Sequence, residues 1–143
     1  MRYTISTDPT KLDLELIHST LSTMYWYGGR TRSVLEAAIR GSLPFGVYKG
    51  DAQIGFARVI TDYATFAYLA DVFILEAHQG QGLGKRLVQD ILTHPELATC
   101  GWMLFTKDAH SLYAQYGFEP PEQPERLMRR KSVEREPLVD QRN

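Results

Sequence analysis

The sequence has few of the residues that form disulfides or bind metals. It contains a single cysteine, Cys100, which excludes an internal disulfide bond. The four histidines, His18, His78, His94 and His110, are scattered and lack the spacing of a metal-ligand motif. The composition therefore predicts a protein without a disulfide framework and without a metal site.

Long apolar runs and a charge excess of either sign are also missing. No segment has the apolar run of a signal peptide or a membrane span, so we expect a cytoplasmic protein with no membrane partner. Lys and Arg together number 16, against 17 Asp and Glu, which gives a formal net charge of −1. This balance argues against a nucleic-acid partner, because such a surface needs a clustered basic excess.

Length and local composition predict one domain followed by a tail. A chain of 143 residues is long enough for one sizeable core and too short for two ordinary domains. We therefore expect a single domain over residues 1–132. Residues 133–143 are charged and poor in large apolar side chains, which predicts a disordered C-terminal tail.

Local patterns predict the order of elements within this domain. We expect a strand at residues 3–7, a helix that begins at Asp8-Pro9, and a second helix that ends at Gly41. Antiparallel strands are expected at residues 45–48, 53–60 and 68–75, followed by a helix from Leu83. A strand at residues 102–106, a short helix at 108–116, and two last strands at 118–120 and 126–130 complete the prediction.

The most informative stretch runs from residue 68 to residue 92. A buried-strand pattern breaks there into the alternate glycines Gly80, Gly82 and Gly84, and apolar residues then resume at helical spacing. A helix N-terminus presents unpaired N–H groups and the positive end of the helix dipole, so a phosphate is its natural ligand. Glycine lets such a ligand approach the amides without a Cβ in the way.

Spacing separates the glycine motifs that compete for these residues. A P-loop would need glycine at Gln79 and Ser or Thr at Arg86, and a dinucleotide motif would need its third glycine one residue after Gly84. The pattern that fits is Q-x-x-G-x-G, which follows the strand sequence D-V-F-I-L. This pair of features resembles the acetyl-CoA signature of the GNAT superfamily of N-acetyltransferases.

A second motif extends this resemblance. Residues 109–118, AHSLYAQYGF, are similar to the family's A-x-x-x-Y-x-x-x-G-F, and the resemblance extends over residues 3 to about 131. The resemblance implies an α/β fold of the α+β type, with a mixed, mostly antiparallel central sheet flanked by helices. It also implies that two central strands splay apart to admit the pantetheine arm of acetyl-CoA.

The resemblance assigns residues to acetyl-CoA, the implied cosubstrate. The pantetheine arm is expected along the backbone of Phe73, Ile74 and Leu75, and an N–H near Ile74 is expected to stabilise the oxyanion. Thr106 stands where many relatives have a cofactor-binding asparagine. The pyrophosphate is expected at the turn that comprises Gln79, Gly80, Gln81, Gly82, Leu83, Gly84 and Lys85.

Two side chains are candidates for proton transfer. Tyr113 matches the family's tyrosine and would protonate the departing thiolate; the alternative is that it only packs the short helix onto the sheet. Asp71 is the only charge on the central strand and would bind or deprotonate the amine. The alternative for Asp71 is a structural ion pair with Arg58, with a water relay as the base.

The resemblance places the acceptor site in the loop between the first two helices and in the turn before the central strand. We expect acetyl transfer to a primary amine of a small molecule, by direct attack in a ternary complex. A protein or peptide amine, or a CoA-binding module without turnover, are the alternatives, and a homodimer is left open. The acceptor-site candidates are Trp26, Tyr27, Arg30 and Tyr68, with Tyr25, Asp62 and Tyr63 nearby.

Overall fold

A computed structural model describes residues 2–132 of the chain and is built on one five-stranded sheet in the order β1-β2-β3-β4-β5. Strands β1 to β4 pair as antiparallel neighbours, whereas β4 and β5 are parallel. The predicted mixed, mostly antiparallel sheet is therefore confirmed. The strands are β1 (Tyr3–Ser6), β2 (Leu43–Lys49), β3 (Ala52–Thr61), β4 (Phe66–Ile74) and β5 (Gly101–Met103).

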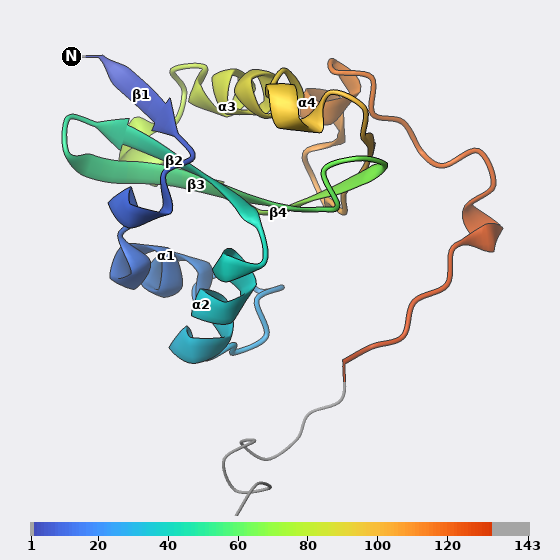
Figure 1. Cartoon of the computed structure of the whole chain (residues 1–143), viewed down its shortest axis with the longest axis horizontal. Coiled ribbons are helices and arrows are strands. Elements are labelled where there is room, and N and C mark those ends of the chain that lie inside the picture. The colour runs from blue at the N-terminus through green and yellow to red at the C-terminus, as the bar shows by residue number, and fades with distance from the viewer. Residues whose placement is uncertain (1, 133–143) are drawn as a thin grey trace, which may run out of the picture.

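Helices cover both faces of this sheet (Figure 1). One face carries α1 (Leu14–Leu21) and α2 (Arg32–Arg40), and the other carries α3 (Leu83–Leu92) and α4 (His110–Ala114). Each face has its own buried apolar core, which we call the α1–α2 core and the α3 core. Short 3₁₀ turns lie at η1 (Pro9–Lys11), η2 (Glu76–His78), η3 (Pro95–Leu97) and η4 (Pro124–Arg126).

Strand β4 changes the direction of its side chains at Asp71. Arg58 of β3 lies opposite Ala70, but two residues earlier in β3 the partner is Phe73, so β4 holds one extra residue between these pairs. Asp71 adopts a left-handed backbone conformation there, with a φ of 57°. In a regular strand Leu69, Asp71 and Phe73 would share one face. Here Leu69 lies in the α3 core and Phe73 in the α1–α2 core, because the extra residue lies between them.

The sheet opens between β4 and β5. These strands pair only from Phe66 opposite Gly101 to Tyr68 opposite Met103, although β4 continues to Ile74. The strand predicted at residues 102–106 therefore ends early, because the chain leaves the sheet after Met103. The resulting gap is the splay that the family resemblance implied.

Helix starts in the first third of the chain differ in part from the prediction. Asp8 caps only the 3₁₀ turn η1, and α1 begins separately, with the Asp13 side chain accepting a hydrogen bond from the Leu16 amide. Thr31 caps the start of α2, since its hydroxyl accepts a hydrogen bond from the Val34 amide at 3.3 Å. A short polar side chain thus satisfies one of the unpaired N–H groups at each of these helix starts.

The prediction of two last strands is wrong. Residues 118–120 and 126–130 are not in strands, and the described chain here contains only the turn η4. Pro120, Pro121 and Pro124 remove backbone N–H donors from this stretch, which disfavours sheet pairing. The segment runs exposed and away from the body of the molecule (Figure 1). The tail predicted at residues 133–143 lies outside the described residues.

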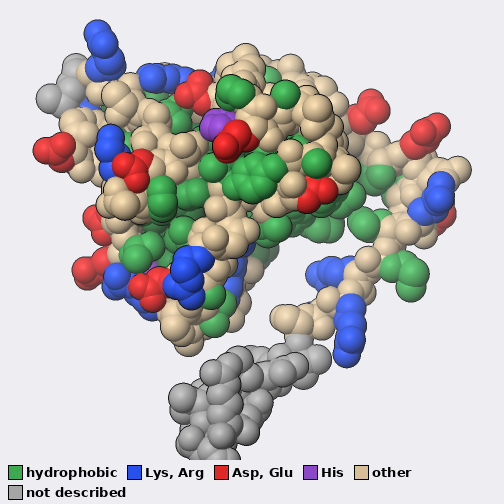
Figure 2. All heavy atoms as spheres, in the orientation of Figure 1, with side chains coloured by type: hydrophobic (Ala, Val, Ile, Leu, Met, Phe, Trp, Pro, Cys, Tyr) green, Lys and Arg blue, Asp and Glu red, His purple; other side chains and the backbone are tan. Residues whose placement is uncertain are grey.

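Acidic and basic side chains are interspersed over the face of the body seen in Figure 2. The exposed segment after Phe118 also carries basic side chains, at Arg126, Arg129 and Arg130. Over residues 2–132, no helix is long and apolar enough to cross a membrane.

Candidate active site

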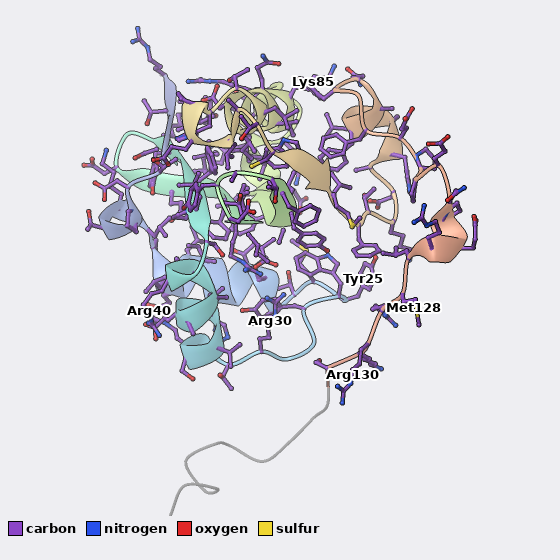
Figure 3. All side chains as sticks on the ribbon, turned by 45° about the vertical axis from the view of Figure 1, so that its right-hand side comes forward. Tyr25, Arg30, Arg40, Lys85, Met128 and Arg130 are labelled. Atoms are coloured by element: carbon purple, nitrogen blue, oxygen red, sulfur yellow. The ribbon has the colours of Figure 1, made fainter. Side chains whose placement is uncertain are left out.

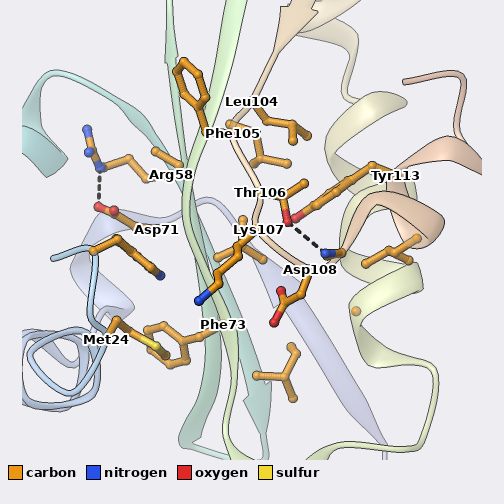
Figure 4. Close-up of a pocket in the computed structure, with 18 of the residues that line it drawn as sticks. Met24, Arg58, Asp71, Phe73, Leu104, Phe105, Thr106, Lys107, Asp108 and Tyr113 are labelled. Carbon is orange, nitrogen blue, oxygen red and sulfur yellow. Dashed lines mark hydrogen bonds and ion pairs between the residues drawn. The ribbon is translucent and has the colours of Figure 1, made fainter. Parts of the chain in front are cut away.

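A cleft of about 1150 Å³ lies where β4 and β5 separate. Its wall is formed by strand β4, Arg58 of β3, the glycine turn before α3, the loop between β5 and α4 with α4 itself, and the loop between α1 and α2 (Figure 4). The glycine motif and part of the predicted acceptor residues, including Trp26, Arg30 and Tyr68, are far apart in the sequence, but they meet in this one cavity.

The glycine turn presents a row of unpaired amides. Gly82 is the residue before α3, with a φ of 77°, and no side chain caps the helix start. The first helical hydrogen bond is donated by the Arg86 amide to the Gly82 carbonyl. Among the described residues, no atom accepts a hydrogen bond from any backbone N–H between Gly80 and Lys85. These donors and the positive end of the helix dipole together form a site suited to an anion.

The glycines of this turn face open space. A Cβ built on Gly80, Gly82 or Gly84 would meet no atom within 4 Å. Gly80 and Gly82 have positive φ angles of 80° and 77°, which explains glycine at both positions. Gly84 lies inside α3 with an ordinary helical backbone, so its backbone does not require glycine. Since Gly84 also lines the cleft, the missing side chain there leaves room for a ligand.

Not every predicted residue of the turn reaches the cleft. Gln79, Gly80, Gly82, Leu83 and Gly84 line it, whereas Gln81 and Lys85 do not. The Gln81 amide oxygen accepts instead from the Tyr3 hydroxyl at 3.3 Å. Lys85 is exposed near the start of α3, on the opposite side of the molecule from Arg30 (Figure 3).

The backbone of β4 offers fewer groups to the cleft than we predicted. The Leu75 amide donates to the Ile54 carbonyl of β3 at 2.8 Å, and Leu75 is not part of the cleft wall. Because backbone groups alternate in direction along a strand, those of Ile74 face the gap beside β5. The Gln79 side chain donates to the Ile74 carbonyl at 2.9 Å, which leaves the Ile74 N–H as the group directed at the gap.

Tyr113 reaches the cleft from α4. Its side chain is 8% exposed and packs edge-on against Phe118, with ring centroids 5.7 Å apart. Figure 4 shows the ring pointing toward Thr106, whose hydroxyl accepts from the Ala109 amide at 3.0 Å and so holds the start of α4. Burial raises the pKa of the Tyr113 phenol above its ordinary value, so at neutral pH it carries the proton that a general acid needs.

Asp71 is held by two arginines. Its Oδ2 accepts from Arg58 Nε at 2.8 Å, and its Oδ1 accepts from Arg30 Nη2 at 3.3 Å. The structural ion pair with Arg58 that the sequence left open is thus present, and Arg30 joins it from the loop between α1 and α2. Both carboxylate oxygens carry charge-assisted hydrogen bonds, which is the geometry of a structural anchor.

The predicted acceptor residues separate into two groups. Trp26, Arg30 and Tyr68 line the cleft, as does Tyr25. Tyr27 does not: it is 2% exposed in the α1–α2 core, and the Arg30 guanidinium lies 4.1 Å from its ring centroid. Tyr27 therefore lies outside the cleft wall, because its aromatic ring is used in packing.

Asp62 and Tyr63 also lie outside the cleft. The Asp62 carboxylate accepts from the backbone amides of Ala64, Thr65 and Phe66, which shapes the turn between β3 and β4. The hydrogen bonds with Thr65 are the largest of the effects that lower the pKa of Asp62 well below its usual range. Tyr63 lines a separate, smaller pocket.

The sequence did not point to several residues of the cleft wall. Lys107 and Asp108 follow Thr106 in the loop between β5 and α4, and both line the cavity. The sequence feature that could have indicated them is a pair of charged residues directly after the strand predicted at residues 102–106, which borders the splay. Within the described part of the chain, no group of three or more His, Cys, Asp or Glu residues could hold a metal ion.

Comparisons with known proteins agree with this geometry. Residues 41–120 match the sequence family described as "Acetyltransferase (GNAT) domain". A crystal structure of a provisionally assigned GNAT-family acetyltransferase from Xanthomonas campestris pv. campestris is 46% identical, with a TM-score of 0.89 over 92% of this chain and 94% of that one. A protein of Gibberella zeae, provisionally assigned as an acetyltransferase, is 34% identical over 139 residues, 79% of this chain and 76% of that protein.

The chain belongs to the GNAT family of acetyltransferases. The resemblance found in the sequence motifs is therefore confirmed, and acetyl transfer is the general activity that the family supports. A GNAT acetyltransferase from Elizabethkingia anophelis, solved with acetyl-CoA bound, shares the fold at 15% identity, with a TM-score of 0.61 over 84% of this chain and 78% of that one.

Proposed function

We propose that the protein transfers the acetyl group of acetyl-CoA to a primary amine of a small molecule, by direct attack in a ternary complex. One observation carries this proposal: the unpaired amides of the glycine turn and the Tyr113 side chain face the same cleft, which continues to the loop between α1 and α2. One cavity would thus supply a phosphate site, a proton donor and an aromatic surface for the acceptor.

The residues of the cleft fit the parts of acetyl-CoA. The amides of Gly80 to Lys85 would bind the pyrophosphate, and the positive end of the α3 dipole adds to this attraction. The gap between β4 and β5 gives the pantetheine arm access to the Ile74 backbone, and Phe73 lines the same part of the cleft. Thr106 lines the same gap, but its hydroxyl already accepts from Ala109, so a cofactor contact would use its remaining hydrogen-bonding capacity.

The reaction requires stabilisation of the carbonyl oxyanion and protonation of the departing thiolate. Bound acetyl-CoA would supply the acetyl group as a thioester; the amine nitrogen forms a bond to its carbonyl carbon and the carbon–sulfur bond breaks. The Ile74 N–H would stabilise negative charge on the carbonyl oxygen. Tyr113 would give its phenolic proton to the departing thiolate and regain one from solvent. The proton released by the amine nitrogen leaves through water.

Asp71 has a positioning role in this proposal. Both of its oxygens accept hydrogen bonds from guanidinium groups, which supports a role in fixing Arg30 and Arg58 over one of free base. A water relay is then the simplest route for deprotonating the amine. Trp26 and Tyr68 give the acceptor end of the cleft apolar surface, which suits a small amine with an apolar body.

Release of the CoA thiol from acetyl-CoA in the presence of a panel of amines tests the proposal. We expect at least one small primary amine to accelerate thiol release in the wild-type protein, and Tyr113→Phe to remove most of that acceleration. If acetyl-CoA binds but neither small amines nor peptide N-termini accelerate release, the protein is a CoA-binding module. If only peptides do, the acceptor is a peptide amine.

A further inference from the structure

Two arginines in the cleft share a single carboxylate. Arg58 comes from β3, Arg30 from the loop between α1 and α2, and both pair with Asp71 of β4, at 2.8 and 3.3 Å respectively. Arg58 is 7% exposed and Asp71 6% exposed, and all three side chains line the cleft. The cluster therefore carries a net positive charge at a largely buried place, which favours binding of an anion.

Both guanidinium groups retain donors for such an anion. Arg58 donates through Nε to Asp71 and through Nη1 to the Ser42 hydroxyl, at 3.2 Å. Over residues 2–132, no protein atom accepts from its Nη2, and that atom is not sealed from solvent. Arg30 uses Nε on the Tyr27 carbonyl and Nη2 on Asp71, so its Nη1 has no acceptor among the described residues. A guanidinium has five N–H donors, and both side chains have some to spare.

Other charged groups near the cluster do not neutralise it. Ser42 lies just after the end of α2, whose carbonyl groups carry a partial negative charge that offsets part of the Arg58 charge. Lys107 adds a further cation to the cleft wall, with its Nζ 5.0 Å from the centroid of the Tyr25 ring. Figure 4 shows its side chain directed toward the Met24 side of the cavity. Lys107 forms no ion pair with any described carboxylate, including its neighbour Asp108.

We propose that the acetyl acceptor carries an anionic group, a carboxylate or a phosphate, in addition to its amine, and that Arg30 and Arg58 bind this group. This inference rests on the proposed acetyl transfer, since it names the substrate class of the same site. The anion would dock on the free guanidinium nitrogens while the amine extends toward the thioester beside Ile74. Amino acids and amino-alkyl phosphates have this chemistry, whereas simple alkylamines and polyamines do not.

Matched pairs of acceptors give the first test. An α-amino acid is compared with its carboxamide, an ω-amino carboxylic acid with its amide, and ethanolamine phosphate with ethanolamine. We expect kcat/KM for thiol release to be about ten- to a hundredfold higher for the anionic member of at least one pair, the size of a charge-assisted hydrogen bond or two. The preference should weaken at high ionic strength. The pair with the largest ratio distinguishes carboxylate from phosphate.

Variants of Arg30 give the second test. Arg30→Met removes one guanidinium and leaves Asp71 paired with Arg58, so the buried pair stays neutral. We expect KM for the anionic acceptor to rise about tenfold while KM for its neutral partner is unchanged. Arg30→Lys, which keeps the charge, is the matched control and should recover part of the loss. Equal losses for anionic and neutral acceptors would overturn the inference and assign Arg30 a purely structural role.

Binding separates this inference from the proposed function. Calorimetry on the CoA-saturated protein measures the affinity for each acceptor without turnover. Tighter binding of the anionic member, lost in Arg30→Met, supports the inference even if no acceptor accelerates thiol release, in which case only the proposed acetyl transfer is wrong. Equal affinity for the anionic and neutral members overturns the inference whatever the turnover results show.

Discussion

The carboxylate of Asp71 accepts a hydrogen bond from Arg58 Nε, at 2.8 Å, across the strand pair that contains the β4 bulge. The extra residue of β4 lies next to this contact. It turns the strand so that the side chains of Asp71 and Phe73 both lie on the side of the sheet covered by α1 and α2. The ion pair and the irregular backbone are thus parts of one local arrangement.

Replacing Asp71 tests whether it is an anchor or a base. Asp71→Asn keeps the shape and tolerates the left-handed backbone, but it leaves two guanidinium groups without a counter-ion. We expect the free energy of unfolding in urea to fall by about 3 kcal/mol, as for a buried pair that loses one partner. The pH profile of kcat/KM, measured on the fraction that remains folded, should keep the wild-type acidic limb. A shifted acidic limb would instead identify Asp71 as the catalytic base.

Tyr113→Phe tests the general acid. The variant keeps the ring that packs on Phe118 and removes only the proton, so kcat should fall about ten- to a thousandfold with acetyl-CoA affinity nearly unchanged. Pre-steady-state measurements should confirm that chemistry limits the wild-type rate. An unchanged kcat together with a lower melting temperature would show that the tyrosine is a packing residue.

Gly84 gives the sharpest test of the phosphate site. Its φ is ordinary, unlike that of Gly82, so a larger residue enters the cleft without backbone strain. We expect Gly84→Leu to weaken acetyl-CoA binding by about tenfold or more, through the loss of amide contacts to the pyrophosphate. Gly84→Ala is the matched control and should stabilise α3 by about 0.5 to 1 kcal/mol. If Gly84→Leu binds acetyl-CoA like the wild type in calorimetry, the ligand does not lie on these amides.

Buried tyrosines predict a loss of stability in alkali. Burial is the main cause that raises the pKa values of Tyr27, Tyr48, Tyr68 and Tyr113 above the ordinary value in the folded protein. The unfolded chain ionises first, near pH 10, so the free energy of unfolding should be constant below that pH and fall as the pH rises further. Urea titrations between pH 8 and 11 measure this slope, and Tyr113→Phe should make it shallower. A rise in stability over this range would contradict the burial of these phenols.

Local sequence patterns were sufficient for the parts of the site that depend on neighbours in the chain. The helix start after Gly82 follows from the spacing of the glycine motif, and the position of Tyr113 on α4 follows from the spacing of the second motif. The Arg58–Asp71 pair could be proposed as well, because the two residues lie on consecutive strands of a hairpin. In each case the partner lies within a few residues or on the next strand.

Features that depend on distant parts of the chain were not predictable in this way. The bulge at Asp71 depends on how β4 registers with β3, and the third member of its cluster, Arg30, comes from a loop 41 residues earlier. Tyr27 lies in a loop in which we expected acceptor contacts, but its side chain is buried in the α1–α2 core. The strands expected at residues 118–120 and 126–130 have no partner strand in the described chain. A residue composition compatible with a strand is not sufficient, because a strand forms only where it can pair.

The backbone of Asp71 places a second, independent demand on that position. With a φ of 57°, it favours glycine, asparagine and aspartate over other residues. The two arginines require a carboxylate at the same point, which glycine and asparagine lack. Glutamate has the charge but not the conformational preference, so aspartate alone satisfies both demands. A position that looks like an ordinary polar residue in an apolar strand therefore tolerates almost no substitution, for reasons unrelated to any contact with substrate.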